Sequence, residues 1–125
     1  MSYIKRHSVT VTTDSLGDAE SYTDALTGRL INVIYTKDDY AAGVDFAITA
    51  ESSGLGIWTE SNVNATKTVS PRQPTHTQVG VANSTAGDVL LTDIYLAQER
   101  IKIVIDEGGD TKAGTFEFII EGPTG

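Results

Sequence analysis

Hydrophobic and polar residues alternate along this chain with a period of two, in one short segment after another. Residues 44–49 read VDFAIT, and residues 101–106 and 115–121 alternate in the same way. Successive side chains of a β-strand point to opposite faces, so the pattern predicts strands that each bury one face. No segment carries a sustained helical period, and the sequence therefore predicts an all-β fold.

Glycine, proline and short polar residues separate these segments and mark the turns between them. Residues 29–36 are apolar on both faces, which is typical of a central strand. Residues 21–26 are interpreted as a short partner strand, and the glycine-containing residues 107–114 as a hairpin connection. The predicted strands, about eight in number, are residues 3–12, 21–26, 29–36, 44–49, 57–60, 88–97, 100–106 and 115–121.

Residues 1–125 have the length of a single domain with one hydrophobic core. The simplest arrangement of the strands is an antiparallel two-sheet β-sandwich, and we predict a jelly-roll-like one. The alternation does not encode strand order, so it leaves jelly-roll and immunoglobulin-like connections open. The start of the first strand, residues 1–8, is expected to serve as an N-terminal arm that contacts a partner.

Residues 61–87 differ from the rest because Asn, Thr, Ser and Gln dominate them. Pro71 and Pro74 each lack the backbone donor that a central strand needs, so this segment is predicted to be a long, partly extended loop or edge arm. A loop of this length in a compact domain is commonly functional. We expect Pro71 and Pro74 to stiffen it and Arg72, between them, to pair with a carboxylate of a partner.

The formal net charge of −8 disfavours binding to nucleic acid and to anionic membranes. The chain has no cysteine, which excludes disulfides, thiolate catalysis and zinc–thiolate sites. The first residues are charged and lead into Val/Thr alternation, so we expect a soluble protein made in the cytoplasm. Lys5, Arg6, His7 and Arg72 are basic islands that fit either an acidic partner surface or ordinary solvated cations equally well.

Neither of the two histidines, His7 and His76, lies in a serine-hydrolase motif such as G-x-S-x-G. We expect both on the surface or in an interface, and we expect neither enzymatic activity nor a cofactor. A small carbohydrate-active enzyme or lectin is a remote alternative, since Trp58 is the only tryptophan.

Two groups of carboxylates lie close together in the sequence. They are Asp38, Asp39 and Asp45, and Asp106, Glu107 and Asp110. Either group could meet around a hard cation such as calcium, but the spacing fits no EF-hand loop. Turn aspartates that support local backbone structure are the favoured interpretation, and no metal site is expected.

Several stretches that together cover most of the chain resemble a family of small virion proteins of tailed bacteriophages. They are residues 3–14 (YIKRHSVTVTTD), 27–35 (TGRLINVIY), the strand with Trp58, 70–74 (SPRQP), 99–105 (ERIKIVI), Gly108-Gly109 and 112–115 (KAGT). The resemblance implies a capsid decoration, or cement, protein. Such proteins are β-rich, bind the outside of the icosahedral shell as oligomers and brace junctions between major capsid subunits.

The function expected from residues and resemblance together is that of a non-enzymatic cement protein on the capsid exterior, made in the host cytoplasm. Its expected partners are the major capsid protein and itself, as a dimer or trimer, because a sandwich has edge strands that must be covered. The alternative is another virion component, such as a head-fibre, tail-associated or host-surface-binding module.

Overall fold

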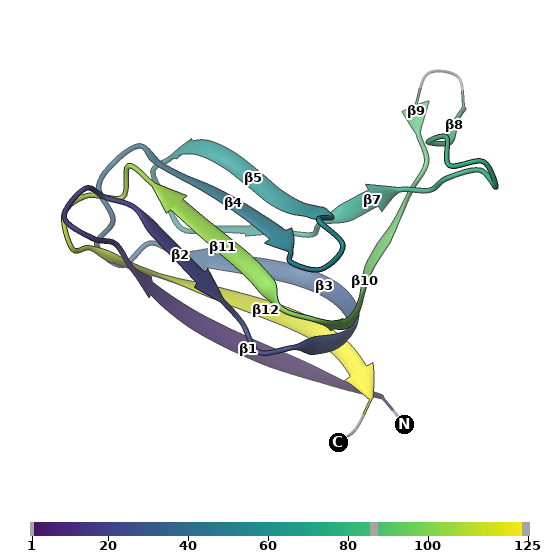
Figure 1. The fold of residues 1–125 in the computed structure, drawn as a ribbon, viewed down its shortest axis with the longest axis horizontal. Coiled ribbons are helices and arrows are strands. Elements are labelled where there is room, and N and C mark those ends of the chain that lie inside the picture. The colour runs from purple at the N-terminus through teal and green to yellow at the C-terminus, as the bar shows by residue number, and fades with distance from the viewer. Residues whose placement is uncertain (1, 86–87, 124–125) are drawn as a thin grey trace.

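The computed structural model describes residues 2–85 and 88–123, and two antiparallel β-sheets stack face to face in it (Figure 1). The larger sheet has the order β1 (Ser2–Thr12), β12 (Ala113–Pro123), β3 (Leu26–Thr36), β10 (Leu91–Glu99) and β7 (Arg72–Pro74), and β6 (Lys67–Val69) also pairs with β3. The smaller sheet has the order β2 (Ala19–Tyr22), β11 (Ile101–Asp106), β4 (Val44–Ala50) and β5 (Gly56–Val63). The short strands β8 (Ser84–Thr85) and β9 (Asp88–Val89) pair with each other.

The long strands are connected as a jelly roll. Taken in chain order, β1 to β5 and β10 to β12 are eight strands, and they form sheets of order 1-8-3-6 and 2-7-4-5. This is the two-sheet antiparallel sandwich predicted above, and its strand order decides between the connections that the alternation left open. An immunoglobulin-like sandwich keeps its first two strands in one sheet, whereas β1 and β2 lie in different sheets here.

The core lies between the sheets and has an aromatic centre. Phe46 contacts Tyr35, Phe116 and Trp58, with ring centroids 5.2, 5.3 and 4.7 Å apart. Tyr35, Phe46 and Phe116 occupy inward positions of the period-two pattern on β3, β4 and β12. The alternation of residues 44–49, 101–106 and 115–121 therefore identified the buried positions correctly.

Residues 2–8 do not form a free N-terminal arm, since they belong to β1, and residue 1 lies outside the described residues. That residues 1–8 contact a partner stays a prediction. Strand β1 pairs with β12 along its whole length, from Ser2 opposite Pro123 to Thr12 opposite Ala113. The polar run from Lys5 to His7 suggested an arm, but an edge strand tolerates such residues because one of its faces and its outer edge meet solvent.

Two other local predictions are also wrong. The predicted strand at 21–26 is divided, because β2 ends at Tyr22 and β3 begins at Leu26 in the other sheet. Residues 107–112 are not a hairpin connection, since β11 and β12 lie in different sheets. Gly108 instead accepts the amide of Ala41 and donates its own amide to the carbonyl of Gly17, so this crossover packs against two other loops.

The predicted loop over residues 61–87 is wrong at its start, because residues 61–63 complete β5 and residues 67–69 form β6. The later part forms a projecting ribbon, while residues 86–87 lie outside the described residues. Strand β10 pairs with β3 from Ile94 onward, whereas its earlier residues, Leu91 to Asp93, pair with β7. At this end of β3 the neighbouring strand is β6. We call residues 72–85 and 88–93 the arm, which extends past the stacked sheets at the upper right of Figure 1.

Candidate interaction surfaces

The arm exposes aliphatic side chains to solvent. The exposed fractions are 84% for Val79, 60% for Val81, 46% for Leu90 and 58% for Leu91. The sequence between Pro74 and Thr92 contains a single acidic residue, Asp88, and neither lysine nor arginine. Several exposed aliphatic side chains on one segment are a feature of protein-binding surfaces.

Backbone hydrogen bonds hold the arm in an ordered shape. Thr75 donates its amide to Leu90, and Asn83 donates its amide to Thr75, both over 2.8 Å. At the tip, Thr77 donates to the carbonyl of Val81 over 2.8 Å, and its hydroxyl oxygen accepts the amide of Val81. The arm is therefore a hydrogen-bonded ribbon whose aliphatic side chains are presented without a core behind them.

The predicted partner residues of this region lie at the base of the arm. Arg72 Nε is 3.2 Å from Asp93 Oδ1, and Nη1 donates to the carbonyl of Pro71 over 2.9 Å. Pro74 lies opposite Leu91 in the register between β7 and β10. The guanidinium of Arg72 thus links β7 to β10 within one chain. The sequence could not predict its pairing with Asp93, because that pairing depends on the register between the two strands. That Arg72 binds a partner stays a prediction.

The other predicted partner residues, Lys5, Arg6 and His7, lie on β1, at the opposite edge of the larger sheet from β7. They do not form one cluster, because successive side chains of a strand point to opposite faces. Arg6 Nη1 is 3.2 Å from Glu117 Oε2, whereas the ammonium of Lys5 lies over the ring of Tyr3. The structure therefore does not bring these residues together with Arg72.

Arginine–carboxylate pairs cover the outer face of the larger sheet. Arg29 donates from Nη2 to Glu121 over 2.8 Å and from Nη1 to Asp93 over 3.3 Å. Asp93 also pairs with Arg72, and Arg6 pairs with Glu117. The outward carboxylates on the strands of this face each have an arginine partner, and the pairs balance in charge.

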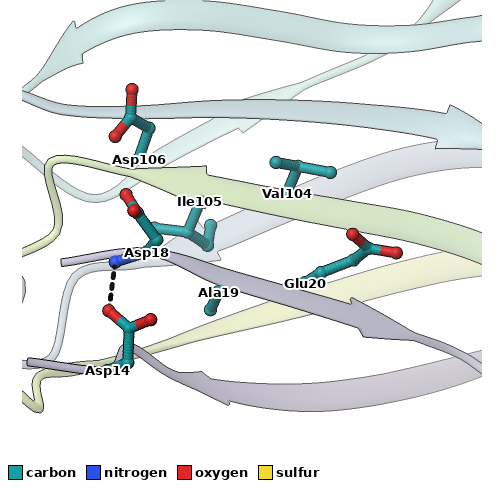
Figure 2. Close-up of a pocket in the computed structure, with 7 residues that line it drawn as sticks. All are labelled: Asp14, Asp18, Ala19, Glu20, Val104, Ile105 and Asp106. Atoms are coloured by element: carbon teal, nitrogen blue, oxygen red, sulfur yellow. Dashed lines mark hydrogen bonds between the residues drawn. The ribbon is translucent and has the colours of Figure 1, made fainter. Parts of the chain in front are cut away.

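The outer face of the smaller sheet carries a hollow of about 530 Å³ (Figure 2). It is lined by Asp14, Asp18, Ala19, Glu20, Val104, Ile105 and Asp106. In Figure 2 the carboxylates of Asp18 and Asp106, from the start of β2 and the end of β11, lie next to each other. Asp14 Oδ1 accepts the amides of Leu16 and Asp18, which holds the turn before β2.

The interaction of its side chain with that of Asp106 raises the pKa of Asp18 above its ordinary value. Lost hydration and the charges of Asp106 and Asp14 act in the same direction. Together these causes disfavour the charged form of the Asp18 carboxyl group.

A second, smaller hollow of about 150 Å³ adjoins the first. Its lining residues are Asp45, Phe46, Ala47, Thr59, Ser61, Val104 and Asp106. Val104 and Asp106 line both hollows, so the depression continues across β11 from β2 to β5. Asp45 lies directly opposite Asp106 in the register of β4 and β11, and its Oδ1 accepts the amide of Asn62 over 2.8 Å.

The carboxylate groups that were near in sequence do not assemble in space as considered above. Asp38 accepts from the hydroxyl of Thr115, and Asp39 accepts the amide of Ala113, so both connect the loop after β3 to the start of β12. The actual neighbours of Asp106 are Asp18 and Asp45. Within residues 2–85 and 88–123, no group of three or more histidine, cysteine or carboxylate side chains is arranged to hold a metal ion.

Trp58 is 9% exposed and packs edge-on against Phe46, so its ring offers no open platform for a sugar. His76 lies in the arm, where it forms an isolated bridge with Ala82. The described part of the chain contains no helix that is long and apolar enough to cross a membrane.

Comparison with known proteins adds no family assignment. No protein-family model matches the sequence, and no curated protein is significantly similar to it.

Proposed function

We propose that this protein is a non-enzymatic structural part of a tailed-phage virion, a capsid decoration protein that binds the outer surface of the major capsid shell and stabilises it. The arm is the observation that carries the proposal. It presents Val79, Val81, Leu90 and Leu91 on an ordered ribbon beyond the body of the jelly roll. Such preorganisation lowers the entropy lost on docking.

The low charge of the arm supports the same role. The whole chain, with its net charge of −8, repels other acidic surfaces. The part of the arm around Val79 and Val81, in contrast, carries no charged residue near it in the sequence and can approach a neutral or acidic surface at less cost. Burial of its aliphatic side chains would then supply the affinity. Among the strands that the structure describes, β1 is at the edge of the larger sheet and pairs on one side with β12, so its outer edge is open to a second copy. This supports self-association as a dimer or trimer on the shell.

The neighbouring carboxyl groups of Asp18 and Asp106 invite comparison with the two carboxyl groups of an acid protease. Both residues are exposed, however, and sit in an open hollow rather than in an enclosed cleft. We therefore do not assign a catalytic role to this pair.

Occupancy on phage particles that lack their own copy of the protein tests the proposal. The test variant is Val79→Asp with Val81→Asp on the arm, and the matched control is Leu16→Asp. Leu16 is 81% exposed, as Val79 is 84% exposed, but lies in the turn before β2. We expect the arm variant to lose at least about ten-fold in occupancy and the control to bind normally, because only the arm side chains become buried.

Both variants should keep the thermal midpoint of the parent, since exposed positions contribute little to folding. Equal occupancy of the arm variant and the control would refute docking through the arm. Gold labelling of intact particles separates a cement protein, which covers the head, from a fibre or tail component. Absence of the protein from the shell would exclude the cement role.

A further inference from the structure

The depression across the smaller sheet combines an apolar floor with an acidic rim. Its floor is made by Val104 and Ala47, which point outward from β11 and β4 and are only half-buried. Its rim carries Asp18, Asp106 and Asp45 from three neighbouring elements. Apolar atoms that remain exposed in a hollow favour occupation by a ligand with apolar stems, not by ions alone.

The rim carboxylates have no cation of their own. Among residues 2–85 and 88–123, neither Asp18, Asp45 nor Asp106 forms an ion pair, while Glu20 has Lys102 only at 3.8 Å. Asp106 and Asp45 face each other directly across β11 and β4, an arrangement that destabilises a sheet. Asp18 adds a third carboxylate beside Asp106 (Figure 2).

A cation placed between these carboxylates would relieve the repulsion. Lysine and arginine fit best, because their charged groups would meet the rim while their methylene stems cover Val104 and Ala47. In an extended segment, side chains two residues apart lie on the same side, about 7 Å apart. Asp18, Asp106 and Asp45 follow one another across neighbouring strands about 5 Å apart, so two such cations can lie along this row of three carboxylates. The depression therefore has the charge and the shape for an extended basic segment.

We propose that this depression binds an extended segment of another protein that carries two lysine or arginine side chains on one face. This goes beyond docking through the arm, because it concerns the opposite sheet and a partner of opposite charge. A second copy of the chain is a poor source of the segment. Lys5 and Arg6 lie within the paired strand β1, and Arg6 is engaged by Glu117. Arg100 and Lys102 have the two-residue spacing, but Arg100 pairs with Glu51 and Lys102 lies on β11, which is paired on both sides.

The test uses the purified full-length protein and the synthetic peptide acetyl-Gly-Lys-Val-Lys-Gly-amide, with the Gly-Glu-Val-Glu-Gly analogue as the charge control. Binding is followed by calorimetry and by the backbone amide NMR signals of β2, β4 and β11. We expect the lysine peptide to shift the signals of Ala19, Ala47 and Val104, and the glutamate peptide to shift none of them.

Three variants locate the site. Asp106→Asn should weaken binding of the lysine peptide at least about ten-fold, since it removes the carboxylate common to both hollows. Asp24→Asn removes the same charge from an exposed residue outside the hollows and should leave binding within about two-fold. Val104→Ala should weaken binding about three-fold, because the stems of the lysines lose part of the floor. Asp106→Asn should fold at least as stably as the parent, so its loss of binding would not reflect unfolding.

Equal weakening in Asp106→Asn and Asp24→Asn would overturn the proposal in favour of general charge attraction. It would also be overturned if calcium chloride alone shifted the same signals and the lysine peptide did not. Because this experiment needs no virion, its outcome is independent of whether the arm docks on a capsid.

Discussion

The outer faces of the two sheets differ in which side chains lie next to their carboxylates. On the larger sheet, Glu117, Glu121 and Asp93 each lie next to an arginine. On the smaller sheet, Asp18, Asp106 and Asp45 lie next to one another. Both faces are built on the same jelly roll with the same period-two alternation. The difference between them is therefore a difference in which side chains the strand register brings together.

Pairing and repulsion have different consequences for the two faces. The paired face stabilises its own sheet and needs no partner, although half-exposed ion pairs contribute modestly. The face with unpaired carboxylates loses some stability and gains affinity for a cationic ligand. Local arrangements that oppose folding are expected at functional sites, where binding compensates for them.

The largest loss in the free energy of unfolding is expected where β3 and β12 approach each other closely, in the sheet that carries the paired face. Gly28 has a φ of +136°, and a Cβ atom there would lie 2.3 Å from the carbonyl oxygen of Glu121. We expect Gly28→Ala to cost about 3 kcal/mol in the free energy of unfolding, because steric overlap adds to backbone strain.

Gly54→Ala is the control for this substitution, since Gly54 also has a positive φ, of +74°, but has open space around it. It should cost about 1 kcal/mol from backbone strain alone. Urea unfolding measures both variants. Similar losses in the two would show that the close approach of β3 to Glu121 is unimportant.

A smaller loss is expected from removing one arginine of the paired face. Arg29→Met should lower the urea midpoint clearly, because Arg29 contacts both Glu121 and Asp93 and its side chain is only 33% exposed. Arg6→Met removes a single pair whose arginine is 63% exposed, and should change the midpoint little.

The effect of Arg29→Met should also shrink as the pH falls, since protonated carboxylates no longer attract the guanidinium. Measuring both variants near pH 7 and near pH 3 tests this dependence. Equal effects of Arg6→Met and Arg29→Met would mean that the network is no stronger than an isolated surface pair.

The smallest change in the free energy of unfolding is expected on the face with unpaired carboxylates, where removing a charge should stabilise the fold. The ordinary pKa of an aspartate is 3.8, and that of Asp18 is raised, so folding disfavours its charged form. The fold therefore loses stability as the pH rises through the raised pKa of Asp18. Asp18→Asn should be slightly more stable than the parent near pH 7 and equal to it near pH 3, where Asp18 is protonated in both states.

The comparison with the parent at each pH is needed because other carboxylates act in the opposite direction. Arg100 lowers the pKa of Glu51, and Lys67 lowers that of Glu60, so their stabilisation is lost as the pH falls through the lowered pKa values. Thermal unfolding across this pH range gives the difference between parent and variant. A less stable Asp18→Asn near pH 7 would contradict repulsion on this face.

The period-two alternation alone was enough to predict an all-β sandwich and most of its strands. The alternation within each strand indicates which of its faces is buried, as Val44, Phe46 and Ile48 do in β4. The projecting arm was indicated in part, because Pro71 and Pro74 suit an edge and not a central strand. These features depend on residues that are close in sequence, and a sequence displays them directly.

Only the tertiary structure decided the strand order and the chemistry of the two faces. Asp106 was grouped in sequence with Glu107 and Asp110, yet its partners in space come from β4 and the start of β2. Arg29 and Glu121 are 92 residues apart and meet only because β3 and β12 are neighbours. Cross-strand neighbours are set by a global register between distant segments, and alternation within one strand carries no information about that register.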